Sequence, residues 1–208
     1  MRKIFLIMFI MINILVFSNK QNMINFMRTH NKNLSEKEAA FIYDVSMHYS
    51  KKYNVDPALV FSVMKTESHF KHSTVSTAGA KGLMQLMPFN FNEFQVDNSI
   101  EGNIKGGILH LRRDLDSTNN IVKALVCYNA GCSRLSNNAW LKIKETTDYV
   151  TKINKIYPII KNILRGNEKY TENLNFSKLP QNESEKEVKP IRRLKIERSE
   201  IKKQKTVK

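Results

Sequence analysis

The run Glu67-Ser-His-Phe-Lys-His-Ser-Thr-Val-Ser-Thr-Ala-Gly-Ala-Lys-Gly-Leu-Met-Gln-Leu-Met-Pro88 contains the features that decide this fold. Its one carboxylate, Glu67, stands at the end of an apolar helical stripe. A turn of small residues follows. The segment from Gly82 to Met87, which carries the amide Gln85, is then predicted to start another helix that Pro88 ends. The run therefore predicts a carboxylate beside a turn, facing a second helical segment.

Glu67 shares one helix face with apolar side chains. The spacing i, i+3, i+4 and i+7 is occupied by Val60, Val63, Met64 and Glu67. Surroundings that are poor in water penalise the charged form of a carboxyl group and raise its pKa. A glutamate in such a place stays protonated near neutral pH and is able to donate a proton. The alternative is a buried structural glutamate paired with a lysine or a helix end.

Helix signals recur along the chain and predict an all-α, mainly helical fold. Ser35 and Glu38 form a capping-box pattern ahead of a helix that runs to about residue 53. Asp56-Pro57 starts a second helix, which ends just after Glu67. Further helices are predicted over residues 100–115, 121–128 and 145–157, with an irregular connector over 89–99, Gly131 at a C-terminal turn and Pro158 kinking or ending the last helix.

Length and charge limit the possible functions. The 208 residues suffice for one ordinary core with flanking segments. The net charge of +15 divides into +5 for each of residues 1–34, 35–165 and 166–208. The central part is thus only mildly basic, which argues against a nucleic-acid binder. The basic flanks favour contact with an anionic cell wall or membrane surface, and compositional drift towards Lys, Asn and Ile explains them equally well.

Four segments are predicted from these patterns. Residues 1–22 are interpreted as a signal peptide or membrane anchor, because a basic start precedes an apolar run and no small-x-small cleavage site follows it. Residues 23–34 are interpreted as a linker, residues 35–165 as the folded domain and residues 166–208 as a disordered basic tail. The protein is accordingly predicted to be exported.

Cys127 and Cys132 are the only cysteines in the sequence. They lie too close together to connect distant parts of a fold, so a disulfide framework is not indicated. We interpret Cys127 as a small buried side chain. A local disulfide or a metal-binding pair is the alternative, and no histidine cluster supports a metal.

Four motifs, in this order, resemble those of the soluble lytic transglycosylases of bacterial cell walls: Glu67-Ser68, the turn from Ser76 to Gly79, Gly82-Leu83-Met84-Gln85, and Tyr128-Asn129-Ala130-Gly131. The resemblance covers roughly residues 35 to 160. It implies a lysozyme-like domain in the periplasm or cell envelope that binds peptidoglycan glycan strands. The bond cleaved would be the β-1,4 bond from MurNAc to GlcNAc. The resemblance implies no metal, no cofactor and no nucleic-acid partner, and we expect a monomer.

The resemblance also assigns roles. Glu67 would be the catalytic group, first as an acid on the leaving oxygen and then as a base on the C6 hydroxyl, which closes a 1,6-anhydro ring. Ser76 would orient Glu67, and Gln85 and Asn129 would hold the N-acetyl group. The full set of substrate-binding residues comprises Ser68, Ser76, Met84, Gln85, Tyr128, Asn129 and Tyr149.

Two other functions remain open on the sequence alone. A hydrolase similar to goose-type lysozyme would need a second group to hold a water molecule. The sequence offers no clear one, because Asp97, Glu101, Asp114 and Asp116 fall in segments predicted as connector or exposed helix faces. A non-catalytic wall-binding protein would not require Glu67. The short connector after Pro88 and the two cysteines depart from the family pattern and leave the cleft shape undetermined.

Overall fold

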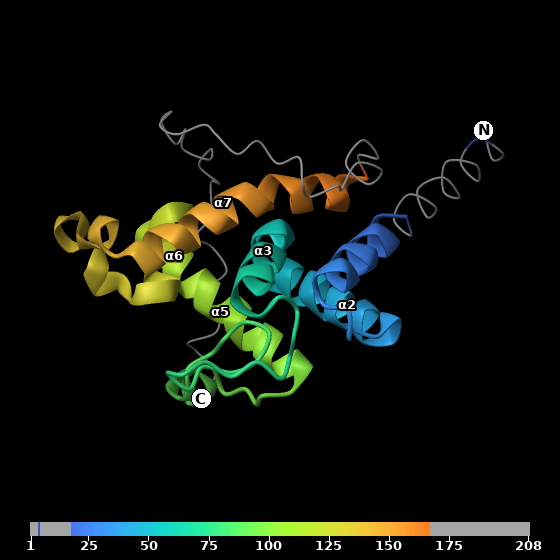
Figure 1. Ribbon diagram of the computed structural model, residues 1–208, viewed down its shortest axis with the longest axis horizontal. Coiled ribbons are helices and arrows are strands. Elements are labelled where there is room, and N and C mark those ends of the chain that lie inside the picture. The colour runs from blue at the N-terminus through green and yellow to red at the C-terminus, as the bar shows by residue number, and fades with distance from the viewer. Residues whose placement is uncertain (1–3, 5–17, 167–208) are drawn as a thin grey trace.

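The computed structural model describes residue 4 and residues 18–166, which form a mainly helical single domain (Figure 1). Residues 18–30 are helical. The elements that follow are α2 (Glu36–Lys52), α3 (Pro57–Ser68), α4 (Pro88–Phe94), α5 (Ile100–Thr118), α6 (Ile121–Ala130), the 3-10 segment η1 (Cys132–Lys142) and α7 (Lys144–Arg165). The prediction of a mainly helical fold is confirmed for these residues. The predicted tail and most of the predicted signal or anchor segment lie outside them.

Side-chain caps fix where the helices begin. Ser35 accepts a hydrogen bond from the Glu38 N–H at 3.1 Å, and Asp56 accepts one from the Ala58 N–H at 2.8 Å. Asn120 accepts one from the Lys123 N–H at 3.0 Å. These bonds satisfy backbone donors that have no partner within the first helical turn. The predicted starts of α2, α3 and α6 are therefore confirmed.

Helix α3 forms the centre of the domain. It packs against α7 and α2, and the view of Figure 1 shows it between α7 above and α5 below. Residues 58 to 64 are all buried, so this helix is enclosed on every side over its first two turns. A helix that is apolar all round belongs in a core, and the surrounding amphipathic helices turn their apolar faces towards it. This central position brings its C-terminal end to the site described below.

The segment predicted as a linker belongs to the folded domain. Met23, Phe26 and Met27 on the helix of residues 18–30 are at most 1% exposed and join the same hydrophobic core as α3. The Asn19 amide also donates to the Leu164 carbonyl at 3.2 Å. The linker prediction for residues 23–34 is therefore wrong, and the folded domain begins before residue 35. The apolar residues Met23, Phe26 and Met27, at spacing i, i+3 and i+4, provide the helical stripe that packs here.

The segment from Gly82 to Met87 is a turn, and the helix predicted there does not form. Lys81 and Leu86 exchange two backbone hydrogen bonds of 2.9 Å, and both Gly82 and Gln85 have left-handed backbone angles, with φ of 81° and 49°. Such angles are incompatible with a right-handed helix. Pro88 begins α4 instead of ending a helix, since a proline without an N–H suits a first helical turn. Part of the predicted connector is therefore helical.

Helix α7 continues past Pro158 to Arg165, which is longer than predicted. Pro158 removes one backbone hydrogen bond, but Ile159, Ile160 and Ile163 beyond it are buried in the core. Burial of these three side chains offsets the lost bond. None of the described helices has the length and apolar character needed to cross a lipid bilayer, and residues 5–17 lie outside that observation.

Candidate active site

Glu67 lies in the last turn of α3 and is partly exposed, although protein atoms surround most of its carboxyl group. Burial raises the pKa of Glu67 from 4.5 to about 7, the Tyr149 hydroxyl opposes this rise, and the charge of Glu145 adds to it. The carbonyl groups at a helix C-terminus carry partial negative charge and also disfavour a carboxylate there. Near neutral pH, Glu67 is therefore able both to donate and to accept a proton.

Two buried tyrosines stand near Glu67. Tyr149, from the first half of α7, is 6% exposed, and Tyr128, from the end of α6, is 9% exposed. Burial raises the pKa of both phenols well above the usual range, and the charge of Glu67 contributes in each case. The Tyr149 hydroxyl lies close enough to act on the Glu67 carboxyl, although the two are not aligned as a regular hydrogen bond. The structure thus brings together three residues predicted for the site.

Two hydrogen bonds to backbone carbonyls of the turn at residues 81–87 hold this turn against the site. The Tyr128 hydroxyl donates to the Met84 carbonyl at 2.7 Å, and the Ser68 hydroxyl donates to the Leu83 carbonyl at 2.9 Å. Met84 itself is fully buried, and its Cβ would lie 2.5 Å from a Cβ added at Gly107. Gly107 therefore lets this turn approach α5 closely. Ser68 and Met84 hold the turn in place, and their direct contact with a substrate stays a prediction.

Three further predicted residues lie on or beside the same turn. The Gln85 amide nitrogen donates to the Thr74 and Gly82 carbonyls at 3.1 and 2.8 Å, so this group braces the turn. Ser76 accepts a hydrogen bond from the Ala80 N–H at 3.0 Å, and its predicted contact with Glu67 stays a prediction. Asn129 is partly exposed at the end of α6. Its predicted contact with an N-acetyl group also stays a prediction.

A network of charged and polar side chains beside Tyr128, buried at His110 and Asp114, was not predicted from the sequence. The His110 ring stacks on Tyr128 with centroids 4.3 Å apart, and its Nε2 lies 3.2 Å from the Asp114 carboxylate. Arg113 contacts the other Asp114 oxygen at 3.1 Å and reaches Glu93 at 2.6 Å. Asp114 is only 2% exposed, so its interpretation as part of an exposed helix face is wrong. The i, i+4 spacing of His110 and Asp114 was the signal that could have revealed the pair.

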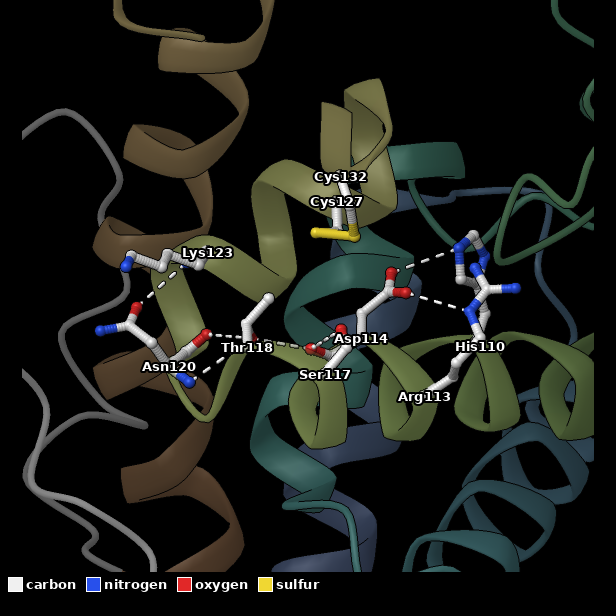
Figure 2. The surroundings of a disulfide bond; sticks show 9 residues. All are labelled: His110, Arg113, Asp114, Ser117, Thr118, Asn120, Lys123, Cys127 and Cys132. Atoms are coloured by element: carbon white, nitrogen blue, oxygen red, sulfur yellow. Dashed lines mark hydrogen bonds and ion pairs between the residues drawn. A yellow bond between two sulfur atoms is a disulfide. The ribbon is translucent and has the colours of Figure 1, made fainter. Parts of the chain in front are cut away.

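Cys127 and Cys132 form a disulfide bond, which corrects the interpretation of Cys127 as a lone buried thiol. The bond joins the last turn of α6 to the first residue of η1 and encloses Tyr128 and Asn129 between its two ends. Figure 2 shows it on the same side of α5 as Asp114 and His110. The alternative of a local disulfide is therefore the correct one. Across residues 4 and 18–166, no group of three metal-ligating side chains is close enough to hold an ion.

Comparison with known sequences decides the family. The Transglycosylase SLT domain model matches residues 44–151, just over half of the chain. This chain belongs to the SLT domain family. The matched region contains α3, the turn of residues 81–87, α6 and the start of α7, which are the parts that assemble around Glu67. The helix of residues 18–30 precedes the matched region.

The SLT domain is also similar to a curated protein from Enterobacteria phage PRD1 named "Transglycosylase". The two are 38% identical over 120 residues, which is 57% of this chain and 42% of the phage protein. The chain therefore spans less than half the length of that relative.

Two solved structures are also similar. Lytic transglycosylase Slt of Pseudomonas aeruginosa, an inactive mutant, has 25% identity and a TM-score of 0.43 over 64% of this chain and 24% of that one. The 70 kDa soluble lytic transglycosylase of Escherichia coli has 19% identity and a TM-score of 0.45 over 75% of this chain and 30% of that one.

Proposed function

We propose that this SLT domain is a lytic transglycosylase with a lysozyme-like fold. It would cleave the β-1,4 bond from MurNAc to GlcNAc in peptidoglycan and leave a 1,6-anhydro-MurNAc end. The observation that carries the proposal is the pKa of about 7 for Glu67, a carboxyl group that is packed by protein yet partly exposed. A group with this pKa can act as an acid and then as a base near neutral pH, and this reaction requires both.

The reaction proceeds in two steps at one carboxyl group. Protonated Glu67 gives its proton to the glycosidic oxygen, the bond from that oxygen to C1 of MurNAc breaks, and the GlcNAc end leaves as an alcohol. The Glu67 carboxylate then takes the proton of the MurNAc C6 hydroxyl, whose oxygen bonds to C1. The group returns to its protonated state and no water is consumed. Because both reacting groups belong to one bound sugar, much of the entropic cost of bringing them together has already been met.

The surroundings of Glu67 support a mechanism with a single carboxylate. Asp114 is a buried carboxylate near Tyr128, but Arg113 bonds one of its oxygens and His110 Nε2 lies 3.2 Å from the other. Glu145 acts on the pKa of Glu67 through its charge and is exposed on the first turn of α7. A hydrolase would need a carboxylate to activate a water molecule. In that case Glu145 is the residue we would assign to hold the water.

The experiment compares three versions of the full-length chain: wild type, Glu67→Gln and Glu145→Gln. Each is incubated with purified peptidoglycan, and the released muropeptides are identified by mass spectrometry. We expect anhydro products, lighter by one water than hydrolysed ones, from wild type and Glu145→Gln but not from Glu67→Gln. Hydrolysed products that disappear with Glu145→Gln would establish the lysozyme-like alternative. Sedimentation with the wall without any products would establish a binding protein.

We also propose that the protein is exported to the periplasm or cell envelope. The basic start and apolar run of residues 1–17 support export, and the disulfide is compatible with an oxidising compartment. The test is to fractionate cells after trapping free thiols. We expect the chain in the envelope or periplasmic fraction with both cysteines blocked by their bond. A cytosolic chain with two free thiols would contradict this proposal.

A further inference from the structure

The turn that directly follows Glu67 has an unusual backbone. His69 ends α3 with φ of 52°, and Phe70 follows with φ of 62°. Both are bulky residues in the left-handed region, where a Cβ atom crowds the following carbonyl group. Two such residues in succession persist only when surrounding contacts hold them. The contacts that hold this turn therefore also determine where the last turn of α3, and with it Glu67, is placed.

The helix of residues 18–30 supplies those contacts. Phe70 is fully buried, and its ring meets Phe26 edge-on at 6.1 Å and His30 edge-on at 6.3 Å between centroids. Directly after the helix, the Asn31 amide donates to the Phe70 carbonyl at 3.0 Å. One helix and the residue that follows it thus hold both the side chain and the backbone of Phe70.

The charge effects on the pKa of His30 also indicate that the end of the first helix lies near the end of α3. The pKa of His30 is lowered mainly by burial, and the charges of Lys65 and His69 lower it further. Both of these residues belong to the last turns of α3 or its cap. The C-terminal end of the first helix therefore lies against the C-terminal end of α3. The N-terminal end of the first helix is fixed elsewhere, since Lys20 pairs with Asp44 at 2.7 Å.

We infer that Phe26 and Asn31 are positioning residues for Glu67, acting through the left-handed turn at His69 and Phe70. The inference rests on the proposed function and deepens it. Residues 18–34 lie upstream of the SLT match at residues 44–151, so this support comes from outside the matched region. The Ser68 hydroxyl, which bonds the Leu83 carbonyl, lies between Glu67 and the supported turn. Loss of the support would therefore displace both Glu67 and the turn of residues 81–87.

The first test compares Asn31→Ala with Asn33→Ala in the full-length chain. Asn33 is exposed and provides the same chemical change two residues away. We expect Asn31→Ala to lower kcat on soluble glycan strands about tenfold with little change in KM, because a small misplacement of a catalytic group is costly. Water admitted to Glu67 would also lower its pKa, so the basic limb of the kcat profile should move to lower pH. If Asn31→Ala and Asn33→Ala have the same kcat, and if their kcat falls at the same pH on the basic side of the profile, the inference is overturned.

The second test separates positioning from general stability. Phe26→Ala and Met23→Ala each remove a side chain at most 1% exposed from the same helix, and both should lower the thermal midpoint. At a temperature well below both midpoints, only Phe26→Ala should lower kcat. An equal loss in both variants would show that the helix acts through stability alone, which would also overturn the inference.

The two proposals can fail separately. The pKa of the Glu67 carboxyl can be measured by NMR titration in wild type and in Asn31→Ala whether or not the chain has activity. If wild type releases no anhydro products, the proposed function fails. If that pKa is the same in wild type and Asn31→Ala, the positioning inference fails, whatever the products are.

Discussion

Glu67 and Asp114 are two packed carboxylates near Tyr128, and their surroundings differ. Both charges help to raise the pKa of the Tyr128 phenol, so both groups lie near it. The influences on Glu67 are burial, the Tyr149 hydroxyl and the negative charge of Glu145. Asp114, by contrast, has Arg113 at one oxygen and His110 at the other.

Neighbouring charged groups, more than burial, therefore decide what a packed carboxylate does. A buried carboxylate with a guanidinium group beside it, as Asp114 has in Arg113, is held as a structural ion pair. One that lacks such compensation binds a proton near neutral pH and is available for acid–base chemistry. Glu67 should therefore matter for activity and cost stability, whereas Asp114 should matter for stability and little for activity.

The largest expected effect is from Glu67→Gln. Removal of a general acid should lower kcat by a factor on the order of 10³. The same variant should be more stable than wild type at pH 8. Because Glu67 has a pKa of about 7 when folded and 4.5 in its ordinary state, wild type loses stability as pH rises between these values. The gain should reach about 3 kcal/mol above pH 7 and vanish at pH 4.

Denaturant unfolding at pH 4 and pH 8 measures this change. A Glu67→Gln chain that is equally or less stable than wild type at pH 8 would mean that the carboxyl is well solvated, and the contrast with Asp114 would disappear.

Asp114→Asn should produce the opposite pattern. It removes the buried carboxylate beside His110 and one of the two carboxylates that Arg113 contacts, which should lower the free energy of unfolding by about 3 kcal/mol. Below its lowered thermal midpoint, kcat should change less than tenfold, since Asp114 contacts the site through His110, which stacks on Tyr128, and otherwise acts on Tyr128 and Tyr149 through its charge.

Asp116→Asn is the matched control for Asp114→Asn. Asp116 also lies on α5 and pairs with Arg112, but its side chain is 35% exposed. Loss of such a pair should cost less than about 1 kcal/mol. Equal destabilisation by the two variants would show that burial does not distinguish the two ion pairs.

The sequence predicted those parts of the molecule whose signals are local. The caps at Ser35, Asp56 and Asn120, and the apolar spacing that leads to Glu67, each act within one or two helical turns. Family motifs added Tyr128 and Tyr149, which approach Glu67 from different helices. These signals were sufficient for the fold class and for the centre of the site.

The features that the sequence did not reveal depend on contacts between distant segments. Phe26 is part of the core because Phe70, far along the chain, covers it, and a polar neighbourhood around residues 28–33 favoured a linker instead. Asp114 looked exposed because the packing of α6 on α5, which buries it, is a tertiary effect. The turn at Gly82 has residues that also suit a helix, and the Asn103 side chain that binds the Met84 N–H at 2.8 Å comes from α5.

The disulfide should have a smaller effect than the ion pair at Asp114. A bond between residues five positions apart constrains only a short loop of the unfolded chain, so its loss should lower stability by about 2 kcal/mol. The test is thermal unfolding of wild type with and without a reductant, alongside the Cys127→Ala/Cys132→Ala double variant. The Tyr128 hydroxyl donates to the Met84 carbonyl, and we expect this bond to persist without the disulfide, so kcat should change little. A large loss of kcat without loss of stability would assign the disulfide to the site rather than to the fold.

Tyr149→Phe should give the smallest change in stability and the most specific change in pH dependence. The Tyr149 hydroxyl lowers the pKa of Glu67, so its removal should raise that pKa and move the basic limb of the kcat profile to higher pH. Because the hydroxyl has no well-formed hydrogen bond within the described residues, the free energy of unfolding should change by less than about 1 kcal/mol.

Tyr157→Phe is the control on the same helix. It removes a hydroxyl that donates to Asp56 at 2.6 Å, so it should lower stability and leave the limb in place. A limb that moves to lower pH in Tyr149→Phe would mean that the hydroxyl shields Glu67 from water more than it stabilises its charge, and Glu67 would then owe its high pKa to Tyr149 as well as to the apolar face of α3.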